Sequence, residues 1–133
     1  MPNSYIKEIT HLSDKLGQSL KFNTQLIKAL DLSNEGIAIL NADGKYIWLN
    51  QAHEKMFGYE HKELVGQSWE VLYSQSYREH IKNKVFPIIE KNKKWKGETT
   101  GVLKDGKTPV KQMVYLTALD CGGLVCTCIK NDI

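Results

Sequence analysis

Apolar residues between positions 36 and 50 form two short runs, which are separated by the polar segment Asn41-Ala42-Asp43-Gly44. An Asp-Gly pair supplies the positive backbone dihedrals that a tight hairpin turn needs, and the Ile, Leu, Tyr and Trp residues beside it suit a half-buried strand. The pattern therefore predicts a β-hairpin. Because residues 37–40 are apolar without a break, we expect the first strand to be buried on both faces.

Three short helical segments are predicted after the hairpin, at residues 51–57, 60–65 and 69–74. Asn50 is placed to cap the first segment, because an Asn side chain accepts hydrogen bonds from the free N–H groups of a first helical turn. Gly58 is placed to end it, since glycine readily adopts the left-handed conformation that closes a helix. Segments this short are stable only when they pack on a larger element.

A longer helix is predicted over residues 76–91. Five apolar residues fall on one face of it, namely Tyr77, Ile81, Val85, Ile88 and Ile89. Pro87 lies inside this segment, where a proline removes a backbone hydrogen bond and clashes with the carbonyl group four residues earlier. We therefore expect a kink or an early break of the helix near residues 83–86.

Three further strands are predicted in the last part of the chain, at residues 95–103, 108–118 and 123–130. Glycine-containing turns at residues 104–107 and 120–123 separate them. Together with the hairpin, these segments make five strands.

An amphipathic helix is predicted at the N-terminus, over residues 4–30. Its apolar residues follow the heptad a and d spacing of a coiled coil and are Tyr5, Ile9, Leu12, Leu16, Leu26 and Leu30. Ser19 and Asn23 interrupt this series, and Leu20 and Ile27 widen the apolar stripe beyond a two-stranded seam. The alternative is a solvent-facing linker helix that is ordered only in a full-length protein.

Five short motifs follow one another along the chain. The second predicted strand ends in Asn50, which is followed by Ala52 and by a helix that ends in Phe57-Gly58-Tyr59. The other four motifs are Glu63-Leu64-Val65-Gly66, Trp95-Lys96-Gly97-Glu98, Lys104-Asp105-Gly106-Lys107 and Asn131-Asp132-Ile133. With these motifs in this order, residues 26–133 resemble a PAS domain, a small sensor module of signalling proteins.

The resemblance implies an α+β PAS fold, in which short helices and one longer crossing helix lie on one face of a five-stranded antiparallel sheet. We accordingly divide the chain into an N-terminal helix at residues 1–30 and a PAS domain at residues 31–133. In PAS proteins a helix in the first position commonly packs across the outer face of the sheet or pairs with a second copy. We expect a homodimer, with helix contacts from Ile9, Leu12, Leu16, Leu20, Leu26, Ile27 and Leu30.

The resemblance also implies a pocket between the sheet and the crossing helix, which in this family holds haem, flavin, a small organic acid or nothing. The expected lining is apolar and aromatic and consists of Trp48, Met56, Phe57, Trp69, Leu72, Ile81, Val85, Ile88, Met113 and Tyr115. The same residues describe a filled core equally well, because they include no fixed polar group that would orient a ligand.

We expect no cofactor, and haem and flavin remain the alternatives. His80 is the only histidine on the crossing helix and is the candidate axial ligand for haem, but it lies one position off the apolar stripe. The light-sensing PAS branch needs a cysteine in an Asn-Cys-Arg motif, and residues 66–77 contain no cysteine. Covalent flavin photochemistry is therefore not expected.

The composition argues against several other classes of protein. The net charge is only +3 and Arg78 is the single arginine, whereas phosphate recognition favours the bidentate arginine fork, so no nucleic-acid binding is expected. The basic run at residues 91–96 is interpreted as a solvated loop. No stretch is apolar enough to span a membrane, so no direct membrane contact is expected. Cys121, Cys126 and Cys128 match neither a disulfide framework nor a metal site, which fits a reducing, cytoplasmic location.

Catalysis is not expected either. His11, His53, His61 and His80 are scattered, and the sequence has no nucleophile elbow and no phosphate-binding glycine loop. The leading hypothesis is a PAS sensor or protein-interaction module of a sensor kinase, a cyclic-dinucleotide enzyme or a transcriptional regulator. A ligand or partner would shift the arrangement of a dimer, and the change would pass through Asp132-Ile133 into an output domain. The alternatives are a haem or flavin sensor of redox state or gases, and a purely structural dimerisation domain with a filled core.

Overall fold

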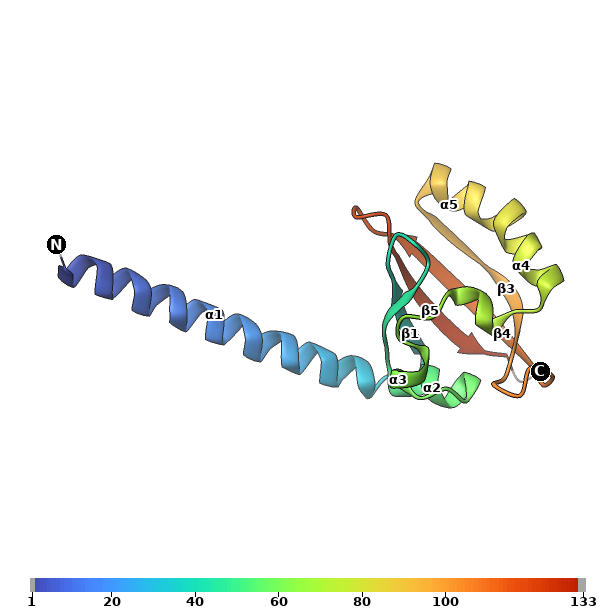
Figure 1. Cartoon of the computed structure of the whole chain (residues 1–133), viewed down its shortest axis with the longest axis horizontal. Helices are drawn as coiled ribbons and strands as arrows, with labels where there is room; N and C mark the ends of the chain where they lie inside the picture. The colour runs from blue at the N-terminus through green and yellow to red at the C-terminus, as the bar shows by residue number, and fades with distance from the viewer. Residues whose placement is uncertain (1, 132–133) are drawn as a thin grey trace. The chain divides into compact units, whose positions relative to one another are not determined.

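The computed structural model describes residues 2–131 and divides the chain after Leu32 into two compact units. The first unit contains the helix α1 (Pro2–Asp31), which the heptad pattern predicts (Figure 1).

The second unit is built on a five-stranded sheet. Its strands are β1 (Gly36–Leu40), β2 (Tyr46–Leu49), β3 (Lys94–Val102), β4 (Pro109–Ala118) and β5 (Leu124–Lys130). They lie in the order β2-β1-β5-β4-β3, and every neighbouring pair is antiparallel. The predicted five-stranded antiparallel sheet is therefore confirmed, and β5 lies at its centre.

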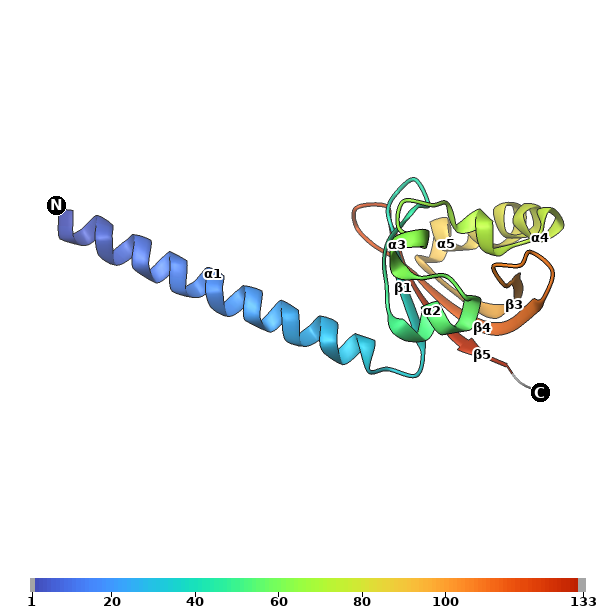
Figure 2. The same cartoon turned by 60° about the horizontal axis from the view of Figure 1, so that its bottom comes forward.

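Short helices cover one face of this sheet (Figures 1 and 2). They are α2 (Gln51–Phe57), α3 (His61–Leu64), the 3₁₀ helix η1 (Trp69–Leu72), α4 (Gln75–His80), the π-helical segment η2 (Ile81–Val85) and α5 (Phe86–Asn92). The last three follow one another directly and form the long crossing helix. The observed architecture is the predicted α+β fold.

The core lies between the sheet and these helices. Its buried members are Ala38, Leu40, Tyr46, Leu49, Phe57, Leu64, Trp69, Leu72, Ile81, Val85, Ile89, Val110 and Cys126. Cys126 and Cys128 are buried free thiols, whereas Cys121 is exposed in the turn that precedes β5. The two buried cysteines therefore act as small apolar side chains.

Asn50 fixes the point at which β2 passes into α2. Its Oδ1 accepts hydrogen bonds from the backbone N–H groups of Ile37, at 2.8 Å, and His53, at 3.1 Å, while its Nδ2 donates to the carbonyl oxygen of Glu35 at 2.9 Å. The predicted N-cap is thus confirmed, and the same side chain ties the start of β1 to α2. Gly58 ends α2 with a φ of 83°, as predicted.

The crossing helix accommodates its proline by widening rather than by breaking. After α4 ends at His80, the N–H of Phe86 donates to the carbonyl of Ile81, five residues earlier. Pro87 then falls in the first turn of α5, where a missing N–H costs little. The expected kink or break near residues 83–86 is therefore replaced by a π-helical segment.

The two faces of the sheet differ in how well they are covered. In β1 the side chains of Ala38 and Leu40 are buried, whereas Ile37 and Ile39 on the opposite face are only half-buried. The helices of this unit cover one face only, so burial of the outer face of β1 stays a prediction.

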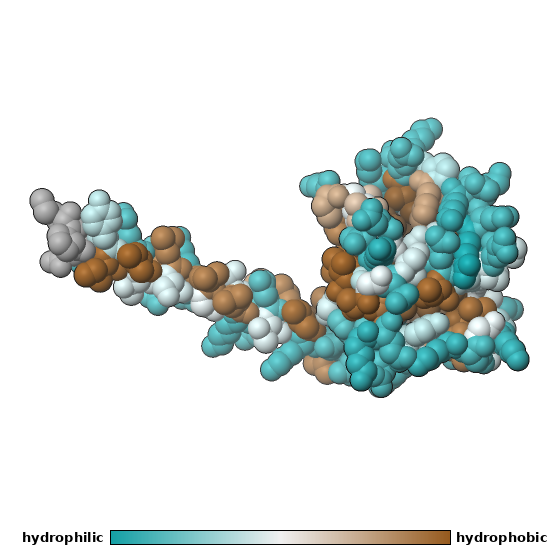
Figure 3. Space-filling model, viewed as in Figure 1, coloured by the Kyte–Doolittle hydropathy of each residue, from teal (hydrophilic) through white to brown (hydrophobic). Residues whose placement is uncertain are grey.

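Apolar side chains run along α1 as a stripe, which the brown atoms in Figure 3 mark. The apolar side chains of α1 include the seven residues from Ile9 to Leu30 that are expected to make helix contacts. Residues three and four positions apart share one side of a helix, so this spacing separates the apolar side of α1 from its polar side. The homodimer itself stays a prediction.

Candidate ligand-binding site

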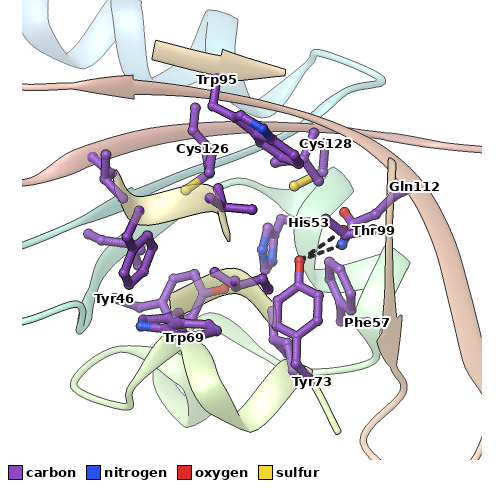
Figure 4. Close-up of a pocket in the computed structure, with 18 residues that line it drawn as sticks. Tyr46, His53, Phe57, Trp69, Tyr73, Trp95, Thr99, Gln112, Cys126 and Cys128 are labelled. Atoms are coloured by element: carbon purple, nitrogen blue, oxygen red, sulfur yellow. Dashed lines mark hydrogen bonds between the residues drawn. The ribbon is translucent and has the colours of Figure 1, made fainter. Parts of the chain in front are cut away.

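A cavity of about 50 Å³ lies between the inner face of the sheet and the helices (Figure 4). It is lined by Leu40, Tyr46, His53, Phe57, Trp69, Leu72, Tyr73, Ile81, Val85, Phe86, Trp95, Thr99, Gln112, Val114, Leu116, Leu124, Cys126 and Cys128. Strands β4 and β5 contribute alternate residues, since only every second side chain of a strand points to the same face. Most of the lining is apolar, and a few polar side chains interrupt it.

Half of the residues expected to line the pocket are found there. Phe57, Trp69, Leu72, Ile81 and Val85 all line the cavity. They come from α2, from η1 and from the π-helical segment of the crossing helix. The spacing of apolar residues on these helices therefore identified part of the inward side.

The other five expected residues lie elsewhere. Met113 and Tyr115 alternate with the inward residues of β4 and so lie on the outer face of the sheet, and Trp48 lies there too, paired with the outward Ile39. Ile88 is 40% exposed on α5, and Met56 lies beside Gly36 at the edge of the core. The inward face of β4 is thus opposite to the predicted one.

His80, the candidate haem ligand, does not line the cavity. Its side chain is exposed at the end of α4, and its ring packs edge-on against Tyr77 with 5.8 Å between the ring centroids. An axial ligand must reach the iron inside the pocket, so this assignment is wrong in position. The cavity, at about 50 Å³, is also far smaller than the roughly 300 Å³ or more that pockets for drug-sized ligands provide.

Tyr73, Thr99 and Gln112 form a hydrogen-bonded polar cluster in the cavity wall (Figure 4). Gln112 Nε2 donates to Tyr73 Oη at 3.0 Å, and Tyr73 Oη lies 3.1 Å from Thr99 Oγ1. Gln112 is 1% exposed, and its Oε1 has no hydrogen-bond partner among the described residues. An unpaired buried polar atom costs about 1–3 kcal/mol, so a ligand that donates to this oxygen would recover that free energy.

His53 is the second buried polar side chain with an unpaired atom. It is 1% exposed, and its ring lies between Tyr46 and Phe57, with centroid distances of 5.6 Å and 5.0 Å. Its Nδ1 makes no hydrogen bond within the described part of the chain. Burial lowers the pKa of His53 to about 4, with a smaller opposing contribution from its own backbone, so the ring is neutral at pH 7.

These polar residues were not among the predicted lining residues, and two signals in the sequence point to them. His53 lies four residues before Phe57 and therefore shares its side of α2, which faces inward. Gln112 alternates with Val110 and Val114, so it occupies an inward position of β4 once the face of that strand is known. A filled core was favoured because the expected lining included no fixed polar group. The cavity does contain such groups, in Gln112 and His53.

The cavity wall carries no formal charge at neutral pH. None of the described residues that line it is Asp, Glu, Lys or Arg. Burial raises the pKa of Cys126 to about 12 and also raises the pKa values of Tyr46, Tyr73 and Cys128, because a buried site disfavours the charged form. With His53 neutral, every titratable group of the lining is uncharged.

The described residues form neither a potential metal site nor a helix that could span a membrane. Within residues 2–131, no three His, Cys, Asp or Glu side chains come together as a potential metal site. None of the helices in that range combines the length and the apolar character that crossing a lipid bilayer requires.

An antiparallel five-stranded sheet with short helices and a crossing helix on one face defines an α+β domain. A family model described as PAS domain matches residues 34–133, and the chain therefore belongs to the PAS domain family. The resemblance drawn from the five motifs is confirmed. Among curated protein sequences, none matches the chain.

Solved PAS domains have the same fold. The PAS domain of a protein from Colwellia psychrerythraea is 23% identical, with a TM-score of 0.75 over 83% of this chain and 97% of that one. The PAS domain of a LuxR-family transcriptional regulator from Burkholderia thailandensis, in complex with ethanol, is 21% identical, with a TM-score of 0.71 over 80% of this chain and 96% of that one. A domain of a sensory box sensor histidine kinase/response regulator from Geobacter sulfurreducens is 22% identical, with a TM-score of 0.67 over 82% and 95%.

Light-oxygen-voltage domains share the fold as well. One of them, studied with a flavin analogue, is 17% identical, with a TM-score of 0.68 over 81% of this chain and 85% of that one. At these identities the likeness shows a common fold.

Proposed function

We propose that this PAS domain senses a small organic molecule, which binds in the cavity between the sheet and the helices. The observation that carries the proposal is a pair of buried polar atoms, His53 Nδ1 and Gln112 Oε1, which have no partner among the described residues and belong to side chains that line this cavity. A well-packed core leaves few such spaces, and buried polar atoms are normally paired. This arrangement favours a binding site over a filled core.

Binding would be passed on through β5, the central strand. Cys126 and Cys128 line the cavity, while Val125, Thr127 and Ile129 alternate onto the outer face of the sheet. A ligand that prefers one arrangement of the sheet increases the population of that arrangement. The receiver would be the output domain of a sensor kinase, a cyclic-dinucleotide enzyme or a transcriptional regulator. The exit through Asp132-Ile133 lies outside the described residues.

We further propose that the chain forms a two-fold symmetric homodimer through the stripe of α1 and the outer face of the sheet. On that face Met113 pairs with Ile129, and Tyr115 lies two residues along the same strand. Tyr115 and Ile129 are 41% and 39% exposed, and a second copy would remove such apolar area from water. A purely structural dimerisation domain is the second candidate, which the stripe of α1 favours.

The proposal assigns binding and no catalysis to the chain. The raised pKa values of Cys126 and Cys128 keep both thiols protonated, and a thiol is a poor nucleophile compared with a thiolate. The three free cysteines fit a reducing compartment, so a cytoplasmic location is part of the proposal. Nucleic acid is not among the proposed partners, since the net charge is only +3 and the Nε of Arg78, the single arginine, donates to backbone carbonyl oxygens.

Absorbance spectroscopy, native mass spectrometry and thermal unfolding of the purified protein test this function. We expect no Soret or flavin band, the mass of a dimer, and a higher melting temperature with at least one member of a panel of small metabolites. A colourless dimer that no metabolite stabilises would contradict the sensing role and support structural dimerisation. A Soret or flavin band would instead support the cofactor-holding alternative.

A further inference from the structure

We propose that the cavity selects an uncharged ligand of about three to five non-hydrogen atoms that carries a hydroxyl or an amide N–H group, and that it excludes carboxylates. Short alcohols, diols and primary amides belong to this class. The inference rests on the proposed small-molecule site and names the chemistry of its ligand.

The volume of the cavity sets the size of the ligand. One water molecule needs about 10–15 Å³ of this kind of volume, so about 50 Å³ corresponds to about three to five water-sized atoms. A molecule with a carbon chain of two or three atoms and one polar group matches that space. Phe57, Leu72 and Val85 supply apolar wall for the carbon atoms.

Gln112 determines which polar group the ligand needs. The Nε2 of its amide uses one of its two N–H groups to donate to Tyr73 Oη. The remaining atom, Oε1, is an acceptor without a partner in the described residues, so the ligand must donate to it. A hydroxyl or an amide N–H does so. An ionised carboxylate has only acceptors and would place negative charge beside this oxygen.

An uncharged cavity wall disfavours the binding of ions of either sign. No Lys, Arg, Asp or Glu is found among the described lining residues, so an ion would lose its hydration without gaining an opposite charge. Arg78, the single arginine, does not line the cavity, and its Nε donates to the carbonyl oxygens of Glu70 and Tyr73 at 2.8 and 2.9 Å. The cavity therefore lacks the guanidinium that carboxylate recognition favours.

His53 provides a second polar contact of matching character. A neutral imidazole has one donor and one acceptor nitrogen, and the unpaired Nδ1 faces no charged group in the lining. A hydroxyl group both donates and accepts, so it can pair with either tautomer of this ring. Both unpaired atoms of the cavity thus favour the same neutral ligand class.

Two probes of equal size test the inference on the intact chain, propionamide and propionate, with propan-1-ol as a third probe. Two-dimensional NMR titrations at pH 7 report binding through the amide resonances of cavity residues. We expect propionamide to bind at least about tenfold more tightly than propionate, because of these two probes propionamide alone has an N–H that can donate to Gln112 Oε1. Gln112→Leu should weaken propionamide binding by about tenfold, whereas Met113→Leu, on the outer face of β4, should leave it unchanged.

The outcomes separate this inference from the proposed function. Equal affinity for propionate and propionamide would overturn the ligand class and leave small-molecule sensing intact. Unchanged propionamide binding in folded Gln112→Leu protein would overturn the role of Oε1. If none of the three probes shifts a cavity resonance, both the ligand class and the proposed site are overturned. The comparison of probes on the unsubstituted chain decides the question even where Gln112→Leu does not fold.

Discussion

Replacing Asn50 with Ala is expected to lower the free energy of unfolding of the PAS domain by about 2–4 kcal/mol. The side chain is fully buried, and its hydrogen bonds within the described part of the chain include those with the backbone of Ile37, His53 and Glu35. Each such bond contributes about 0.5–1.5 kcal/mol net, and the bond to His53 is also the N-cap of α2. In Asn50→Ala all three backbone partners stay in place and lose their bond.

Urea unfolding followed by tryptophan fluorescence measures this loss. Thermal unfolding should show a melting temperature lower by about 10–25 °C, because 1 kcal/mol corresponds to about 4–8 °C in a domain of this size. Asn41→Ala is the matched control, since Asn41 Oδ1 also accepts from two backbone N–H groups, those of Asp43 and Lys45, both at 3.0 Å. These bonds lie in an exposed turn where water can replace them, so we expect a loss below about 1 kcal/mol. Equal losses in the two variants would refute the argument that burial makes Asn50 important.

Three further predictions concern the cavity and the dimer. The folded pKa of His53 is about 4 and lies below the unfolded value near 6.5, so between pH 4 and pH 6.5 only the unfolded chain binds the proton. The free energy of unfolding should therefore fall by up to about 3 kcal/mol as the pH drops from 6.5 to 4. Urea titrations of His53→Gln should show a flatter dependence of this free energy on pH. Leu16→Glu combined with Leu26→Glu should give monomers in light scattering, because charges interrupt the stripe of α1; an unchanged dimer mass would contradict the proposed interface. A Cβ at Gly97 would lie 2.5 Å from Trp95 Cζ2, so Gly97→Ala must displace that ring. We expect the free energy of unfolding to fall by about 1–3 kcal/mol and the tryptophan fluorescence to change. Unchanged fluorescence and stability would show that the ring does not pack against Gly97.

Elements whose ends depend on local chemistry could be predicted from the sequence. Asn50 and Gly58 begin and end α2 through hydrogen bonds that span three or four residues. The turn of the hairpin depends on Gly44, which has a φ of 76°. These signals are complete within a short stretch of chain, so the hairpin and the order of elements followed from the sequence.

The cavity lining could not be predicted in the same way, because it depends on which face of each strand turns inward. Strand β4 has apolar residues on both faces, so Met113 and Tyr115 were as plausible in the cavity as Val114 until the partner strands were known. His53 and Gln112 come from elements far apart in the sequence, and no local pattern shows that both are buried. The π-helical segment η2 was missed because its apolar residues also fit an ordinary α-helix.

The hydrogen bonds of Asn50 also determine how the PAS domain responds to tension. Glu35, whose carbonyl oxygen receives a bond from Asn50, lies three residues after Leu32, where the first unit ends. A pull along this connection meets the bond between Asn50 and Glu35 before it meets the pairing of β1 with β5, which begins at Gly36 and Cys128. Because the same side chain also holds the backbone N–H of His53, the start of β1 and the start of α2 are tied to one buried amide.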